Sequence, residues 1–193
     1  MKKLLTLLLC MLLLPAWALV EETAIPEGYR VVDFGDFTLP IAPNALVTQY
    51  DKDEEDGYVA EIRYLDLSCK QYAPLVVINW SPNNMSAYLK GAHPLKYADS
   101  LRQNTVDTWT ADDMVISEHK TIHGTVRNGQ FTALFYCRME DNGFLTSKPH
   151  DLWLVQRFYG TYDMGTYYFD VYAESREWAD RIIEDLDRIA YKE

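Results

Sequence analysis

Two of the four histidines, His119 and His123, have the four-residue spacing that brings metal ligands together on a helix. They lie in a stretch that predicts a β-strand, where four residues span ~13 Å at ~3.3 Å per residue. Zinc ligands lie ~2 Å from a single ion, so these two side chains are too far apart to share one. His93 and His150 have no fixed spacing to that pair. We therefore expect exposed structural histidines and no bound metal.

The segment from Asp51 to Gly57 carries five acidic residues, and carboxylate oxygens are ligands that calcium prefers. An EF-hand loop that began at Asp51 would need glycine at its sixth position and glutamate at its twelfth. The sequence has Asp56 and Ile62 at these positions. Two interpretations remain, a weak divalent site and a solvated loop between strands, and the failed pattern favours the loop.

No sequence pattern of nucleophilic or cofactor-dependent catalysis is present. The chain has no Gly-x-Ser-x-Gly turn, no glycine-rich phosphate loop and no His-Glu-x-x-His helix. Paired carboxylates of the kind that glycoside hydrolases use meet only in the folded chain, and 29 acidic residues leave many pairings open. We expect a protein without catalytic residues and without a cofactor, with paired acids as the one chemistry that the sequence does not test.

The final predicted strand places Tyr168, Asp170 and Tyr172 on one face, because side chains alternate along a strand. Tyrosine combines an apolar ring with a polar hydroxyl, which suits the binding of a sugar or a partner protein. These three residues are therefore our candidate binding face. The alternative is a sheet covered by helices on both faces, which would bury them and is the more frequent arrangement.

Composition narrows the class of partner. The chain has 193 residues, a formal net charge of −11 and 48% hydrophobic residues, which favours a folded domain over a disordered one. Nucleic acids are poor partners for such an acidic chain, because binding to phosphates needs Lys and Arg. Anionic membrane surfaces are disfavoured for the same reason.

The first 18 residues have the pattern of a signal peptide. Two lysines precede an apolar run from Leu4 to Leu14, which is shorter than the ~20 residues of a membrane span. Ala16 and Ala18 supply the small residues of a cleavage site after Ala18. A lipoprotein is excluded because Cys10 follows a leucine, and an N-terminal membrane anchor is the less favoured alternative. We expect an exported protein, periplasmic or extracellular, with no membrane span after cleavage.

Cleavage makes the net charge of the remaining chain more negative. The 175 residues that follow contain 16 basic and 29 acidic residues, a net charge of −13. Residues 19–29 are polar and predict an exposed lead-in, and residues 30–193 predict a single domain.

Two cysteines, Cys69 and Cys137, remain after cleavage. In an oxidising compartment they are candidates for a disulfide, which would close a long loop. Cys137 alternates with apolar residues on a predicted core face, as a buried free thiol does. The sequence leaves both interpretations open.

Alternation and turn signals predict strands first, then a helix, then two hairpins and a last helix. The expected strands cover 36–40, 58–67 and 75–80, and the expected helical region covers 84–110, interrupted at Gly91 and Pro94. The first hairpin pairs 114–127 with 130–139 around Asn128-Gly129, a strong type I′ turn signal. The second pairs 152–159 with 166–173.

A two-residue turn also predicts the register of the first hairpin. Arg127 then faces Gln130, and Thr125 faces Thr132. The last helix is expected to begin after Ser175, a good N-cap residue, and to carry an apolar stripe from Trp178 through Ile189. Antiparallel hairpins with helices grouped on the faces are typical of an α+β fold.

Several segments in this order resemble those of a known family, namely Phe37-Thr38-Leu39-Pro40, Ile122-His123-Gly124, Gln156-Arg157-Phe158 and Tyr167-Tyr168-Phe169. They resemble the PsbP-like family, which also includes the Ran-release factor Mog and DcrB-like envelope proteins. The resemblance covers most of residues 30–192 and departs from the family in the segment around Pro94. It implies an α/β/α sandwich with a central, mainly antiparallel sheet and a C-terminal amphipathic helix. It implies a binding or assembly role and no catalytic residues.

Two functions follow as hypotheses. The first is an exported, soluble, non-enzymatic domain that binds an unknown protein or glycan partner. The second is a glycan-binding module or small hydrolase that uses the face of Tyr168, Asp170 and Tyr172.

Overall fold

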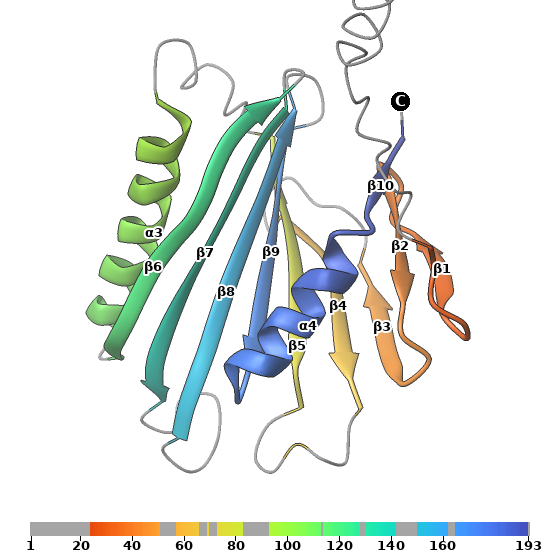
Figure 1. Ribbon diagram of the computed structural model, residues 1–193, viewed down its shortest axis with the longest axis horizontal. Helices are drawn as coiled ribbons and strands as arrows, with labels where there is room; N and C mark the ends of the chain where they lie inside the picture. Colours follow the sequence, from red (N-terminus) through yellow and green to blue (C-terminus); the bar gives the residue numbers. More distant parts are fainter. Residues whose placement is uncertain are drawn as a thin grey trace, which may run out of the picture.

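The structure is a computed structural model that describes residues 24–50, 57–65, 69, 73–82, 93–112, 114–127, 130–141, 150–161 and 165–192. Within these ranges the chain forms strands, a helix, four more strands, a second helix and a last short strand (Figure 1). The elements are β1 (Arg30–Asp33), β2 (Phe37–Ile41), β3 (Ala45–Gln49), β4 (Tyr58–Tyr64), β5 (Leu75–Ser81), α3 (Pro94–Ala111), β6 (Val115–Arg127), β7 (Gln130–Asp141), β8 (His150–Thr161), β9 (Gly165–Ala173), α4 (Arg176–Leu186) and β10 (Ala190–Tyr191).

Two antiparallel sheets organise the molecule. The larger has seven strands in the order β3-β4-β5-β9-β8-β7-β6, and the smaller has three in the order β1-β2-β10. Strands β9 and β5 are distant in sequence but pair at the centre of the large sheet, from Leu75 opposite Tyr172 to Ser81 opposite Thr166. The α+β class expected from the sequence is confirmed.

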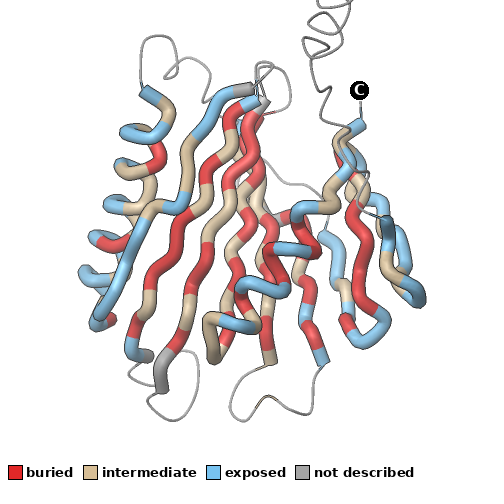
Figure 2. Tube along the Cα trace, in the orientation of Figure 1, coloured by how far each residue is buried: buried red, intermediate tan, exposed pale blue. Residues whose placement is uncertain are grey.

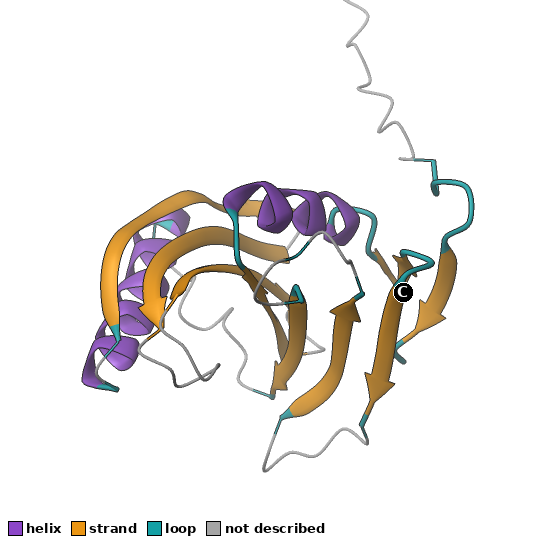
Figure 3. Ribbon diagram, turned by 90° about the horizontal axis from the view of Figure 1, so that it is seen from below, coloured by secondary structure: helices purple, strands orange, loops and turns teal. Residues whose placement is uncertain are grey.

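Helix α4 lies across one face of the large sheet (Figure 3). Its buried residues Ile182 and Leu186 join the main core, together with Ile78 of β5 and Phe169 of β9. Phe37 of β2 belongs to the same core and is fully buried, so the small sheet shares it. As expected, Ser175 caps α4, since its side chain accepts a hydrogen bond from the backbone N–H of Trp178.

Helix α3 packs on the opposite face, along β6 and β7 (Figure 1). Alternate residues of β7 face this helix and are buried, among them Phe135 and Cys137. Ala98 and Val106 are the buried residues of α3. Figure 2 shows the outer side of α3 and much of β6 as exposed, whereas the central strands alternate between buried and half-buried residues.

The first hairpin has the predicted register. Arg127 lies opposite Gln130, Thr125 opposite Thr132, and His123 opposite Leu134, as a two-residue turn requires. The turn residues themselves lie outside the described residues. Further along, the register shifts between Ile116 and Glu118 and between Thr121 and His123, and such bulges re-aim side chains on an edge strand.

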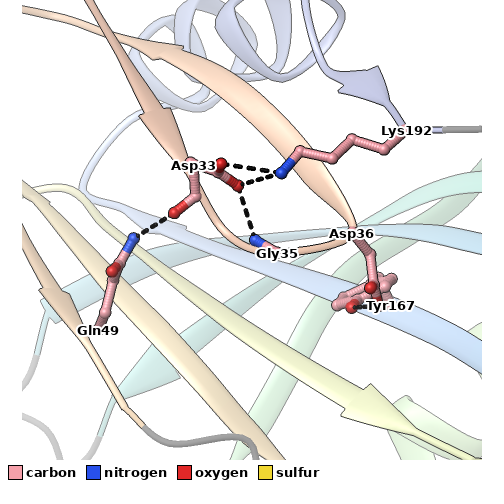
Figure 4. A network of polar contacts seen from close by, with 6 residues as sticks. All are labelled: Asp33, Gly35, Asp36, Gln49, Tyr167 and Lys192. Carbon is pink, nitrogen blue, oxygen red and sulfur yellow. Dashed lines mark hydrogen bonds and ion pairs between the residues drawn. The ribbon is translucent and has the colours of Figure 1, made fainter.

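Polar contacts fasten the small sheet to the large one (Figure 4). The Gln49 amide of β3 donates to the Asp33 carbonyl of β1 over 2.8 Å. Within the small sheet, Lys192, which follows β10, donates to the Asp33 carboxylate of β1 over 2.7 Å. The hydroxyl of Tyr167 on β9 donates to Asp36 in the turn before β2.

The strand predictions differ from the structure at the N-terminal end. Strands β1 and β3 were not predicted, because neither shows a clean alternation of apolar and polar residues. Pro40 was expected to end a strand but lies within β2, opposite Val31. It is tolerated there because β10 pairs only with Phe37 and Thr38, so Pro40 lies beyond the end of that neighbouring strand.

The helix predictions differ at their ends. The long helix begins at Pro94, close to the expected break, because the missing N–H of proline costs nothing in the first turn of a helix. The short helical piece expected before the break falls on residues 84–92, which lie outside the described residues. The last helix ends at Leu186 instead of continuing through Ile189. Ala190 and Tyr191 then pair with β2, which removes them from the helix.

Some predictions concern residues outside the described ranges. The leader of residues 1–18, the cleavage site after Ala18 and the acidic loop from Asp51 to Asp56 all lie there. Of the lead-in, residues 24–29 are described and are mostly exposed, with Tyr29 half-buried. Among the residues that the structure describes, no helix combines the length and apolar character needed to cross a membrane.

Candidate functional site

Asp170 lies near the centre of the large sheet, on β9. Its cross-strand neighbours are Val77 on β5 and Gln156 on β8, and Val77 in turn faces Glu61 on β4. Directly opposed residues of antiparallel strands point to the same face, so these four side chains form one row across the sheet. This is the face on which α3 packs, since Thr105 of α3 bonds Gln156.

The side chain of Asp170 is held by amides. The Gln156 amide nitrogen donates to Oδ1 over 2.7 Å, and the Asn79 amide nitrogen lies 3.5 Å from Oδ2. The Thr105 hydroxyl donates to the Gln156 amide oxygen over 2.7 Å. A chain of polar contacts thus runs from α3 through β8 to the centre of the sheet.

Asp170 has an unusual protonation equilibrium. Burial raises the pKa of its carboxyl from 3.8 to about 6, and the hydrogen bond from Gln156 opposes this rise only in part. Within the described part of the chain, no ion pair with Lys, Arg or His involves Asp170. A half-buried carboxylate without a cation is costly to a fold, and such groups concentrate at functional sites.

The two tyrosines of the predicted binding face are half-buried. Tyr168 packs against the cluster around Ala98, and its ring meets Phe158 edge to face with centroids 5.0 Å apart. Tyr172 packs against the cluster around Val106 and Cys137. The structure therefore brings Tyr168, Asp170 and Tyr172 to one face, as predicted, with rings that pack laterally against the clusters under α3.

On the side away from α3, the same face carries exposed side chains on β3 and β4. We call this region the Asp170 face, formed by Leu46, Thr48, Glu61, Arg63, Leu75, Val77, Asn79, Tyr168, Asp170 and Tyr172. Leu46 is 56% exposed, and Thr48 and Arg63 are also exposed. The exposed side chains of this face thus lie on β3 and β4, whereas Val77 and Asn79 next to Asp170 are half-buried.

The histidines do not form a metal site in the described residues. His119 is exposed and contacts Arg102 through Nδ1, whereas His123 is half-buried. Burial lowers the pKa of His123, and the charge of Arg157 lowers it further. Within the described ranges, no group of three or more His, Cys, Asp or Glu side chains is arranged to hold a metal ion.

No disulfide joins Cys69 and Cys137 in the structure. Cys137 is fully buried on β7, where burial raises the pKa of its thiol to about 11. Cys69 is half-buried between β4 and β5. A buried thiol with a raised pKa is a poor nucleophile, so Cys137 has a packing role.

A second buried carboxylate, Asp185, lies on α4. It accepts hydrogen bonds from the Tyr29 hydroxyl over 3.1 Å and from Arg188 over 2.7 Å. It lines a cavity of about 10 Å³, the size of one water molecule, beside Tyr64 and Trp178. Tertiary packing accounts for its burial, since Tyr29 is 156 positions away in the chain.

No family model matches the sequence, and no curated protein matches it.

Proposed function

We propose that the protein is an exported, non-enzymatic binding or assembly domain that holds its partner on the Asp170 face. The observation that carries the proposal is the half-buried carboxylate of Asp170, which has no cation beside it in the described residues. Residues that serve only the fold are selected for stability, and an uncompensated buried charge reduces stability. A role in binding a partner would account for the presence of Asp170 at this position.

The architecture supports this role. Helices α3 and α4 lie on opposite faces of the sheet, an arrangement consistent with the α/β/α sandwich of PsbP-like proteins. Helix α3 packs on β6 and β7, at one end of its sheet face. The other end of that face, formed by β3, β4 and β5, includes exposed side chains. The signal-peptide pattern of residues 1–18 supports a site of action outside the cytoplasm.

Site-specific photo-crosslinking tests the proposal. A photoreactive amino acid at Thr48, on the Asp170 face, should give a discrete adduct in native envelope or culture medium. The same probe at Glu184, exposed on α4 at the opposite face, is the matched control. Loss of the Thr48 adduct in the Asp170→Asn variant supports the proposal, and adducts of equal yield at both positions contradict it.

The row geometry favours one second candidate, a small glycoside hydrolase. Glu61 and Asp170 are two strands apart in the same row, ~9.6 Å between backbones at ~4.8 Å per strand. This backbone separation is just above the ~6.5–9.5 Å that separates the two carboxyl groups of inverting enzymes. Turnover of chromogenic glycosides that disappears in both Glu61→Gln and Asp170→Asn would favour this candidate over a binding domain.

A further inference from the structure

The two oxygens of Asp170 are bonded unequally. Oδ1 accepts a short hydrogen bond from Gln156, at 2.7 Å. Among the described residues, Oδ2 has one hydrogen-bond donor, the Asn79 amide nitrogen at 3.5 Å, which is the limit of hydrogen bonding. A carboxylate has about four lone-pair sites. The Oδ2 atom is therefore the under-bonded acceptor on the Asp170 face.

The bonded side of the carboxylate is rigidly held. The Thr105 hydroxyl donates to the amide oxygen of Gln156, which directs the amide nitrogen of Gln156 toward Asp170. The three residues come from α3, β8 and β9, so tertiary packing holds the carboxylate in one position. Preorganised groups of this kind bind ligands with little loss of conformational freedom.

The charge around Asp170 is not neutralised by the described side chains. The basic residue on the same face, Arg63, is two strands and one row away, ~12 Å between backbones by strand spacing and rise. Arg63 is instead paired with Glu61, with 4.0 Å between a guanidinium nitrogen and a carboxylate oxygen. Asp170 therefore has no cation among the described side chains, which favours a cation supplied by a ligand.

From these contacts we infer that Asp170 binds a primary ammonium group of an organic ligand, which donates a hydrogen bond to Oδ2. This inference rests on the proposed binding function and names the chemistry of the ligand. A divalent metal ion is disfavoured because it needs several oxygen ligands, whereas the neighbouring amides present nitrogen. A quaternary ammonium is disfavoured because it has no N–H to donate. The tyrosine rings on either side, Tyr168 and Tyr172, provide the apolar walls for the carbon chain of the ligand.

Calorimetric titration with n-butylammonium tests the inference. The wild type should bind this probe, and Asp170→Asn should weaken binding at least ten-fold. The matched control, Glu184→Gln, removes the same formal charge from the opposite face and should bind as the wild type does. n-Butanol and tetramethylammonium should both bind at least ten-fold more weakly than n-butylammonium. Equal binding by Asp170→Asn, or by n-butanol, overturns the inference.

Two further probes distinguish the source of the ammonium group. Nα-acetyl-lysine methylamide represents a lysine side chain, and glucosamine represents an amino sugar; binding of either one that depends on Asp170 supports the inference. If no amine binds but the Thr48 crosslink still depends on Asp170, the ammonium inference fails and the proposed binding function stands. If neither result is obtained, both fail.

Discussion

Asp170 and Gln156 lie directly opposite each other on the adjacent central strands β9 and β8, and the Gln156 amide donates to the Asp170 carboxylate over 2.7 Å. This hydrogen bond from an uncharged amide offsets part of the cost of burying an acid without a cation. It also links the centre of the sheet to α3, because Gln156 is bonded by Thr105. The pair thus joins the candidate site to the packing of the helix.

The pKa of Asp170 gives a prediction for stability. Because the folded-state pKa is raised from 3.8 to about 6, the native state holds this proton more tightly than the unfolded state. The wild type therefore loses stability as pH rises from about 4 to 6, by as much as about 3 kcal/mol. In urea unfolding, Asp170→Asn should lack this loss and be more stable than the wild type above pH 6. Glu184→Gln is the control, and a loss in Asp170→Asn equal to that of the wild type contradicts the assignment.

Gly124 on β6 is expected to tolerate no side chain. A Cβ atom at this position would lie 2.6 Å from both the Ala98 Cβ and the Pro94 carbonyl oxygen. Gly124→Ala must push α3 away from β6 and should cost about 1–3 kcal/mol. Thermal unfolding measures the effect, with the exposed Lys120→Ala on the same strand as control. Equal melting temperatures for the two variants would show that α3 does not pack here.

The cap of α4 provides a test of local structure. Ser175→Ala removes the acceptor for the Trp178 backbone N–H and should lower the free energy of unfolding by about 1 kcal/mol. Ser100→Ala is a matched control, because the Ser100 hydroxyl bonds Lys96 within the turns of α3 and caps no orphan N–H. It should be neutral or slightly stabilising, since alanine is the better helix former.

Phe37 should contribute strongly to the packing of the small sheet against the large sheet. It is fully buried, and its ring lies 5.1 Å from that of Tyr167 and 5.7 Å from that of Phe169 between centroids. Phe37→Ala leaves a cavity where β2 meets β9 and should cost about 3–5 kcal/mol in denaturant unfolding. Val31→Ala, at an exposed position of neighbouring β1, should cost far less. A similar cost for both variants would contradict the shared core.

The thiols are expected to be separate. Without reductant, the purified protein in guanidinium should react with two equivalents of an alkylating reagent at Cys69 and Cys137. In the native state at pH 8, Cys137 should react far more slowly than in guanidinium, since burial shields it and raises its pKa to about 11. Intact mass spectrometry counts the adducts. No reaction in guanidinium without reductant would show that the two residues form a disulfide.

Local signals predicted local structure well. The Asn128-Gly129 turn fixed the register near Thr125 and Thr132, because a two-residue loop leaves only one pairing for its flanking strands. The Ser175 cap and the apolar stripe of α4 were also predicted, since both depend on residues a few positions apart. Strands β1 and β3 were missed because their pairing partners, and not their own alternation, hold them in place.

Sequence alone determined the α+β class, the first hairpin and the shared face of Tyr168, Asp170 and Tyr172, since periodicity places neighbouring residues on faces. Only the tertiary structure decided that Asp170 is half-buried without a cation and that Asp185 lies beneath Tyr29. Burial and hydrogen bonding depend on which distant segments meet. Residues far apart in the chain meet where β9 pairs with β5 and where Tyr29 packs on α4. Local sequence patterns do not predict such long-range contacts.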